Sequence, residues 1–574
     1  ATNQASAMKR LLNRKGLAGY SEDVNRMLAS FAISNARFIA SAYHLGDMNE
    51  AVNAIKQGDV KDAGRRLMEH LMGGPGNIVG SFKEEAAGFR AFLAHWYLLG
   101  SFAAGATNAT QPITMTAPYL AQFTEAKNVV SVMRKAMGEA ISGKFGNDVR
   151  QALAKADDEG HTQPHEIHNM LAESRSAMLG SRGLRRFAKV WGAFFSMAEV
   201  FNRRTSFISA YRIAVERGDS NPYAFAVEAV RQTQGIYSRA NRPDWARSAV
   251  GAVVFTFKQF SIMYIELFWR LRPMQKAQML LILFLFAGLR GMPGAEDFED
   301  ILDTIMQRGG NRAWSTRREI TRGLENALVK AAKMFGIEAE MAEAIGGGLA
   351  QFVDRGISGI PGFPLDISAR MGLHNLIPGT AMFKPSEMDR AGEALEVAGV
   401  AGSFARDVIS SVESGLKGIG ARSVMPLLPK GIRDLIQGSE MVLTGEYKDR
   451  QGRKVMEVTP AEGITKMTGF QPGRVAEAQE RRRQINELSY LRNQKETEFV
   501  NRRAQARLDG DRAAEQRIMN EQKEWNERNP ERRIVIKNKQ IVNKVRQMRR
   551  DADERLLRRT PREARGEVAK ELGR

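Results

Sequence analysis

The segment that most constrains the fold of this chain is the apolar run MLLILFLFAGL, from Met279 to Leu289. It contains no charged side chain, and only Ala287 and Gly288 are smaller than leucine. A helix that crosses a bilayer needs about 20 apolar residues, and a helix on the surface of a globular protein has one polar face. The run fits neither description. Its apolar sides therefore have to be covered by other parts of the chain or by a partner.

The sequence before this run is also apolar. Residues 251–269 contain few polar side chains, chiefly Lys258, Gln259 and Glu266, and Pro273 then interrupts the helical pattern. This pattern predicts a helical hairpin whose arms are about 20 and about 16 residues long. Lys258 and Glu266 would each cost roughly 2.5–3.5 kcal/mol at the centre of a bilayer. We therefore do not expect a permanent transmembrane hairpin.

Two interpretations of the apolar runs stay open. A second run of similar length, AFLAHWYLLGSFAAGA, begins at Ala91. Both runs are either core helices of a large helical domain or helices that neighbouring subunits cover in one assembly and that meet lipid in another. In the second interpretation, the candidates for membrane insertion are the large apolar residues of the hairpin: Val254, Phe255, Phe257, Phe260, Ile262, Ile265, Phe268, Trp269, Leu280, Leu281, Leu283, Phe284 and Phe286.

Helices are predicted along most of the chain. Apolar residues recur at spacings of three and four, and Ala, Leu, Glu, Arg and Met are abundant. The pairs Asn221-Pro222, Thr459-Pro460 and Thr560-Pro561 are typical of helix starts, because a capping side chain precedes a proline suited to the first helical position. Gly46 and Gly218 are typical of helix ends.

Two stretches depart from helix. MVLTGEYKDRQGRKVMEV, from Met441 to Val458, has β-prone runs on either side of a polar turn that contains Gly452, which predicts a small hairpin. The stretch from Gly356 to Thr380 predicts an extended loop, and its Ile, Phe and Leu residues should pin it against a neighbour. We therefore expect an all-α fold: an elongated multi-helix assembly with one small β-hairpin and one long Gly- and Pro-rich loop.

Composition divides the chain into three regions. Residues 1–245 form an N-terminal helical region. Residues 246–470 hold the apolar helical hairpin, the extended loop and the small β-hairpin. Residues 471–574 form a basic region of long charged helices, with 28 Lys and Arg against 18 Asp and Glu. Its net charge of +10 is half of the surplus of +20 in the whole chain.

A basic surplus of this size indicates a polyanionic partner, either nucleic acid or an anionic membrane face. The alternative is a basic scaffold protein whose charge only keeps it soluble. Aromatic residues for base stacking are lacking among the cations of the last region, which favours packed duplex DNA over single strands. The alternatives are a solvated, salt-bridged helix and a helix that docks on an acidic protein. The candidates for contacts to nucleic acid or to a partner are the basic residues near the end of the chain: Arg533, Lys537, Lys544, Arg546, Arg549, Arg550, Arg555, Arg558 and Arg559.

No catalytic centre is predicted from motifs. The chain lacks cysteine, a phosphate-binding loop that ends in Gly-Lys-Ser/Thr, a Gly-x-Ser-x-Gly elbow and a His-Glu-x-x-His motif. Without these motifs the sequence offers neither a thiol nucleophile nor a recognisable hydrolase or nucleotide site.

Two polar clusters have a metal site as one interpretation. His161, His165 and His168 lie at a ligand spacing, but Pro164 separates the first from the other two, and a polar helix start is the favoured alternative. The carboxylates of DFED, residues 297–300, follow a Gly-containing turn, where acidic residues favour the positive end of a helix. We therefore predict no catalytic residue, no metal and no cofactor in this segment.

Four stretches resemble a known family: KGLAGYSEDVNRMLASFAISNARFIASAYHLGDM from Lys15, FNRRTSFISAYRIA from Phe201, TQGIYSRANRPDWARSAVGAVVFTFKQFS from Thr233 and LDISARMGLHNLIPGT from Leu365. They are similar to the C-terminal part of the giant polyvalent proteins of tailed phages and prophages, often labelled PLxRFG-domain proteins. The likeness spans about residues 15–380, and the third stretch is the most specific. The literal Pro-Leu-x-Arg-Phe-Gly string is missing, because Asp-Ile-Ser follows Pro364-Leu365.

The resemblance implies an internal virion protein that is packed inside the capsid above the portal and expelled with the genome into the host cell envelope. Its implied partners are further copies of itself in a ring or core, other internal virion proteins, the portal, packaged double-stranded DNA and, after ejection, the host membrane. The matched stretches carry no known catalytic motif, so no catalytic residue transfers to this chain. The absence of an initiator Met suggests a C-terminal segment of a longer polypeptide.

Three functions follow as hypotheses. The first is a non-enzymatic core and ejection protein that takes part in genome delivery, with a channel across the host envelope as one way of doing so. The second is the non-catalytic part of an enzyme-bearing giant virion protein, with a peptidoglycan-cleaving or polymerase domain upstream. The third is a DNA-binding packaging protein. In the first, the apolar hairpin is shielded inside the capsid and meets lipid only after ejection.

Overall fold

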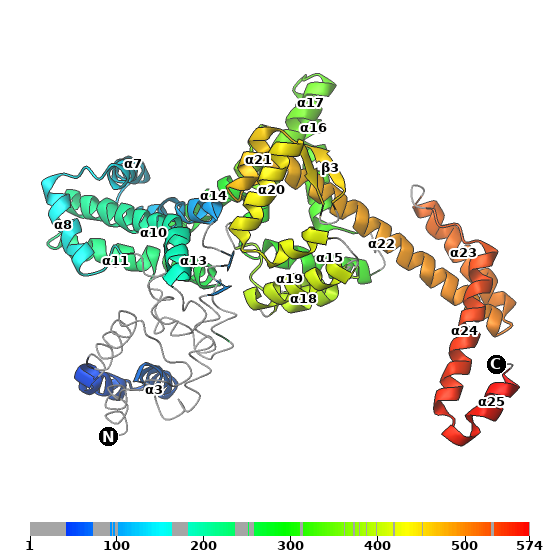
Figure 1. The fold of residues 1–574 in the computed structure, drawn as a ribbon. Coiled ribbons are helices and arrows are strands. Elements are labelled where there is room, and N and C mark those ends of the chain that lie inside the picture. Colours follow the sequence, from blue (N-terminus) through cyan, green and yellow to red (C-terminus); the bar gives the residue numbers. More distant parts are fainter. Residues whose placement is uncertain are drawn as a thin grey trace. The chain divides into compact units, whose positions relative to one another are not determined.

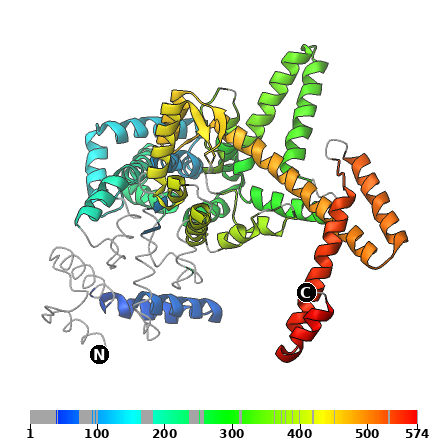
Figure 2. The same ribbon diagram turned by 45° about the vertical axis from the view of Figure 1, so that its right-hand side comes forward.

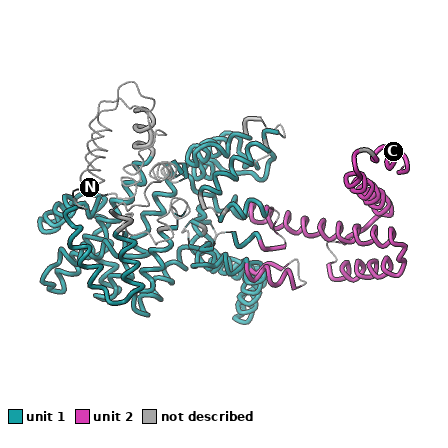
Figure 3. The backbone as a smooth tube through the Cα atoms, turned by 90° about the horizontal axis from the view of Figure 1, so that it is seen from below, with its two compact units in different colours: residues 1–300, 317–382, 390–477 teal, residues 301–316, 383–389, 478–574 magenta. Residues whose placement is uncertain are grey.

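The structure is a computed structural model that describes residues 39, 42–72, 92–93, 96–97, 101–163, 182–235, 251, 258–309, 314–360, 362–370, 373–377, 379–385, 387, 389–397, 399–416, 420–449, 452–529 and 533–572. Helices make up most of these residues, which confirms the all-α fold (Figure 1). The chain forms two compact units (Figure 3). Unit 1 consists of Ala1–Asp300, Arg317–Met382 and Arg390–Glu477, and unit 2 of Ile301–Thr316, Phe383–Asp389 and Ala478–Arg574.

The first part of unit 1 contains α3 (Gly58–Met72), α5 (Phe102–Asn108), the π-helix η2 (Pro112–Thr116), α6 (Ala117–Leu120), α7 (Ala126–Ser142), α8 (Asn147–Asp158), α10 (Arg182–Arg217) and α11 (Pro222–Gln234). α10 is the central element, and α7, α8 and α11 pack along it (Figure 1). The apolar core between them includes Phe207 and Ile213 of α10, Met133 of α7 and Val230 of α11. Burial of these large side chains is what stabilises the bundle.

Hydroxyl and amide groups are buried beside this core. Thr116 Oγ1 lies 2.7 Å from Ser206 Oγ, and the amide of Gln234 donates to both, at 3.2 and 3.1 Å. Thr116 also donates to Thr233 Oγ1 at 3.0 Å. These hydrogen bonds offset the cost of removing the groups from water. They tie the stretch FNRRTSFISAYRIA of α10 to η2 and α11.

Local sequence signals explain three helix boundaries and fail at two others. As predicted, α10 ends directly before Gly218, and α21 (Pro460–Met467) begins after the capping residue Thr459. α11 begins at Pro222 as predicted, and the side chain of Asn221 accepts a hydrogen bond from a backbone N–H of its first turn at 3.0 Å.

The end predicted at Gly46 is wrong, because residues 42–54 are helical through it. A glycine inside a helix costs only about 1 kcal/mol relative to alanine, which neighbouring residues can offset. Thr560 ends one helix instead of starting the next, which begins after a short 3-10 turn.

The middle of the chain continues with α13 (Gln259–Arg270), α14 (Pro273–Ala287), η6 (Leu289–Gly291), α15 (Ala295–Arg308), α16 (Thr316–Met334), α17 (Ala339–Arg355), η7 (Gly356–Gly359), β1 (Leu365–Asp366), η8 (Ser368–Arg370), η9 (Thr380–Phe383), α18 (Arg390–Glu396), α19 (Gly399–Leu416), η10 (Gly420–Leu427), α20 (Lys430–Thr444), β2 (Glu446–Lys448), β3 (Lys454–Glu457), α21 (Pro460–Met467) and β4 (Gln471–Pro472). α13 and α14 share a second core, which includes Tyr264, Leu267, Met279 and Leu283.

The predicted β-hairpin is present but shorter than expected. β2 pairs antiparallel with β3, and Tyr447 lies opposite Met456. The first β-prone run is not a strand, because Met441 to Thr444 is the last turn of α20. Gly445 ends that helix in the left-handed conformation, with φ of 67°, which a residue with a Cβ rarely adopts. The chain then enters β2 directly.

The long Gly- and Pro-rich loop is pinned, as expected. Leu365 pairs with Pro472 in the small sheet of β1 and β4. Arg355 forms a buried ion pair with Asp366, whose carboxylate also accepts hydrogen bonds from the N–H and the hydroxyl of Ser368, at 3.1 and 2.7 Å. Together these contacts give most of the loop a fixed place on unit 1.

Two glycines allow the ends of α14 and α17 to touch. Gly288 and Gly356 follow these helices, with φ of 64° and 60°. A Cβ on Gly288 would lie 2.5 Å from the backbone of Asp354, and a Cβ on Gly356 would lie 2.6 Å from the backbone of Ala287. Arg290 pairs with Asp354 at 2.8 Å beside this contact. Only glycine fits at the two positions without a shift of the backbone.

Unit 2 is built mainly from α22 (Gly473–Leu508), α23 (Arg512–Arg528), α24 (Asn538–Arg559), the 3-10 turn η12 (Arg562–Ala564) and α25 (Arg565–Glu571). A small core joins Phe499 of α22, Ile518 of α23 and Ile534 of the connector before α24. Beyond its first turns α24 runs away from α22 and α23 (Figure 2). Much of its surface is therefore exposed.

Candidate functional site

The apolar hairpin is folded into unit 1 as two short helices, α13 of 12 residues and α14 of 15 residues, with Pro273 at the start of the second. In the part of the chain that the structure describes, no helix has both the length and the apolar character that crossing a membrane requires. The two charges of the hairpin have partners: Lys258 donates to the carbonyl of Asn375, and Glu266 pairs with Arg270 at 3.0 Å.

The membrane-insertion candidates do not share one side of this hairpin. Leu283 is fully buried, whereas Leu281 is 56% exposed and Trp269 is 70% exposed. Intermediate exposure is found for Phe260, Ile262, Ile265, Phe268, Leu280, Phe284 and Phe286. Three further candidates, Val254, Phe255 and Phe257, lie outside the described residues.

α14 is apolar on its outer side as well as its inner side. Met279 and Leu283 face the core, while Met274, Leu281 and Leu285 are exposed at spacings of seven and four residues. These spacings place the exposed side chains along one stripe of the helix. A contiguous apolar stripe on a surface is typical of a contact with another molecule.

The hairpin of α16 and α17 repeats this arrangement. A Cβ on Gly346 would lie 2.5 Å from a side-chain atom of Val329, so the two helices approach closely along the small residues of α17. The other side of α17 presents Met341, Ile345 and Leu349, spaced by four residues and all exposed. The two helices project side by side from unit 1 (Figures 1 and 2).

Large apolar side chains are also exposed at the tip of that hairpin and on α19. Phe335, in the turn between α16 and α17, is 87% exposed. On α19, Ile409, Val412 and Leu416 are exposed at spacings of three and four residues. We call the exposed stripes on α14, α17 and α19 the outward apolar stripes. The stripe on α17 can be predicted from the sequence alone, because its apolar residues recur every four positions.

The charges of α22 and α23 pair with one another. Arg502 pairs with Glu521 at 2.6 Å, and Arg507 and Arg503 pair with Glu515 at 2.9 and 3.3 Å. Within this helical hairpin the cations therefore stabilise the packing of α22 on α23, and part of the predicted basic region is a salt-bridged scaffold.

The cations of α24 have few such partners. Arg558 lies 3.9 Å from Glu554, and Lys544 donates to the side chain of Gln547 at 3.3 Å. Among the described residues, no carboxylate forms an ion pair with Arg546, Arg549, Arg550, Arg555 or Arg559. Arg533 and Lys537, the other two candidates, precede the helix and are exposed. The charge of α24 is thus available to an external anion.

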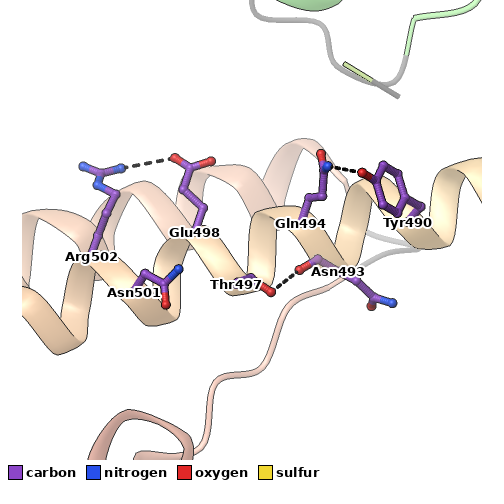
Figure 4. A pocket seen from close by; sticks show the side chains of 7 residues that line it. All are labelled: Tyr490, Asn493, Gln494, Thr497, Glu498, Asn501 and Arg502. Atoms are coloured by element: carbon purple, nitrogen blue, oxygen red, sulfur yellow. Dashed lines mark hydrogen bonds and ion pairs between the residues drawn. The ribbon is translucent and has the colours of Figure 1, made fainter. Parts of the chain in front are cut away.

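A shallow, open groove of about 640 Å³ lies on unit 2 (Figure 4). Its lining comes from one side of α22: Tyr490, Asn493, Gln494, Thr497, Glu498, Asn501 and Arg502. These side chains follow one another along the helix, and the amide of Gln494 donates to Tyr490 Oη at 2.5 Å. The groove is a polar helix face and has no pair of groups arranged as a nucleophile and its base.

The acidic cluster of residues 297–300 holds the long loop. Asp297 lies in the first turn of α15, as its sequence position suggests, but its carboxylate accepts from the N–H groups of Leu376 and Ile377, at 2.7 and 3.2 Å. Asp300 accepts from the hydroxyl of Thr380 at 2.8 Å. The carboxylates thus bind a segment about 80 residues later instead of capping their own helix.

Two histidines lie next to carboxylates. His374 of the loop is 3.3 Å from Glu296, and burial lowers the pKa of its imidazole. His161 is 3.3 Å from Glu159, and burial also lowers the pKa of this imidazole. The remaining two histidines of that cluster, His165 and His168, lie outside the described residues. Within the described ranges, no three His, Asp or Glu side chains are grouped so that they could hold a metal ion.

Comparison with known proteins finds no matching family model, no similar curated protein and no similar solved structure.

Proposed function

We propose that this chain is a non-catalytic segment of an internal virion protein of a tailed phage, which assembles above the portal inside the capsid and takes part in genome ejection. The proposal rests on the four stretches that resemble giant polyvalent proteins and on the outward apolar stripes. The stripes carry most weight, because they are surfaces that a lone chain in water leaves uncovered.

The first partner in this proposal is the chain itself. Helices that bury one apolar side and expose another are covered when copies pack side by side. A head-to-tail contact of this kind gives a ring when its rotation closes. Other internal virion proteins and the portal would cover the remaining stripes. Genome release would separate these contacts and uncover the stripes.

The second partner in this proposal is the host membrane. α14 is about 22 Å long at 1.5 Å per residue, which is shorter than the roughly 30 Å hydrocarbon core of a bilayer. A helix of this length enters a membrane by lying in its interface or by joining other helices. A channel across the envelope would therefore need several copies.

A DNA-binding packaging protein is the second candidate function. The cations of α24 that lack carboxylate partners favour it, because free cations on a helix bind phosphate. The two candidates are compatible, since a protein inside a filled capsid lies against DNA.

The position of the chain in particles tests the proposal. Particles are purified before and after triggered genome release, and the chain is measured by immunoblotting with and without external protease. We expect a protease-protected chain in full particles and its loss from emptied ones. A chain that is absent from full particles, or that external protease removes from them, would overturn the proposal.

A further inference from the structure

Six of the eight cations of α24 fall into two rows along the helix, and Arg549 and Arg559 lie outside both rows. At about 100° per residue, Lys539, Arg546 and Arg550 fall within about 40° of one another. Lys544 and Arg558 belong to a second row, about 130° away around the helix, together with Arg555. Except for Lys544, which is half-buried, these side chains are exposed.

The sides of α24 between the two rows differ in chemistry. On one side Asn543 and Gln547 are exposed, one turn apart. On the opposite side Ile541 is fully buried, and Val545 and Met548 are half-buried. The first half of α24 therefore has an apolar back that is turned inward and an outward face of amide groups between the two rows of cations. In the second half that back is open, because Leu556 is exposed.

Acidic residues are confined to the second half of α24. From Asn538 to Arg550 the helix contains five Lys and Arg and no Asp or Glu. Asp551 and Glu554 then lie on the same outward side as the amide groups. The first half of the helix is thus the part best suited to a polyanion.

We propose that α24 docks in the major groove of duplex DNA. An α-helix with its side chains is about 10–12 Å across, and the major groove is about 12 Å wide. In this arrangement the two rows reach the phosphates of the two strands that border the groove, and Asn543 and Gln547 face the base edges. This inference rests on the second candidate function, DNA binding, and specifies its geometry; it holds whether or not the chain is a virion component.

The direction of the apolar side favours DNA over an anionic membrane. A helix that lies on a bilayer turns its apolar side to the lipid. In the first half of α24 that side carries the buried Ile541, and the exposed side carries amides and cations. The exposed surface therefore matches a groove lined by phosphates and base edges.

Binding of the full chain to a random-sequence 30-base-pair duplex at 50–200 mM salt tests the proposal. Each phosphate contact contributes about −0.9 to the slope of log K against log salt. R546Q/R550Q removes two contacts, so the slope should become less steep by about 1.8. At 0.1 M salt, each lost contact should weaken binding roughly eightfold. D551N/E554Q should tighten binding, which unfolding cannot mimic. The matched control is K127Q/R134Q on α7, where both cations are exposed; it should stay within about twofold of wild type.

Methylation of the bound duplex by dimethyl sulfate identifies the groove. We expect protection of guanine N7 in the major groove, and loss of this protection with R546Q/R550Q. Protection confined to adenine N3 in the minor groove would overturn the proposal. So would an unchanged salt slope for R546Q/R550Q, or binding to phosphatidylserine vesicles without binding to the duplex. None of these results depends on where the chain lies in a particle, so this inference and the proposed function fail separately.

Discussion

Two leucines of α14 separate the contribution of a side chain to folding from its contribution to assembly. Leu283 is fully buried against the core of Tyr264 and Met279, whereas Leu281 is 56% exposed. A buried leucine replaced by alanine costs about 2.7–5 kcal/mol. Complete burial of a leucine contributes about 1.5–3 kcal/mol, and Leu281 is less than half buried, so L281A should cost about 1 kcal/mol or less.

The assay combines hydrogen exchange of the α14 amides in urea with sedimentation velocity of the full chain. L283A should raise the exchange rate of α14 strongly. L281A should leave that rate nearly unchanged but shift the chain from oligomer to monomer, because it shortens an outward apolar stripe. The reasoning is refuted if L281A destabilises α14 as much as L283A does, or if L281A sediments like the wild type.

Three further predictions concern the long loop. D297A leaves two backbone N–H groups of the loop without an acceptor, so urea unfolding of unit 1 should show a loss of about 2–4 kcal/mol, and no loss would contradict the role of this carboxylate. G356A meets backbone atoms at 2.6 Å and should cost more in the same assay than G362A, which has a positive φ but open space around it. Burial lowers the pKa of His374, so the unfolded state binds more protons and the free energy of unfolding should fall as pH drops below about 6.5; H374Q should reduce this dependence, and identical pH profiles would speak against it.

The sequence predicts the helices of this chain better than it predicts which side of each helix is buried. α14 is apolar on all sides, so no period of 3.6 residues distinguishes Leu281 from Leu283. Their difference in exposure arises only when other elements, among them α13 with Tyr264 and η2 with Met115, cover one side of α14. The β-hairpin shows the same limit, because Met441 to Thr444 has a β-prone composition but continues α20 until Gly445 allows the turn.

Electrostatic partners depend on the tertiary register of the helices. Both α22 and α24 are basic in sequence, yet Arg502 pairs with Glu521 across the α22–α23 hairpin. Among the described residues, Arg546 of α24 forms no ion pair with a carboxylate. The partners of Asp297 lie about 80 residues later, beyond any local pattern. The rows of cations on α24 can be predicted from the sequence, because the helical period places each side chain around the axis once the bounds of the helix are known.

Cross-linking inside particles tests most directly the claim that neighbouring subunits cover the outward apolar stripes. The chain has no cysteine, so Leu285→Cys supplies a unique thiol on the stripe of α14, and Lys127→Cys on α7 is a matched exposed control. We predict that a short bismaleimide joins two copies through residue 285 in full particles but not in the chain that leaves with the genome, whereas residue 127 reacts as a single thiol in both. Equal, free reaction of residue 285 in full particles and in the isolated chain would contradict the claim.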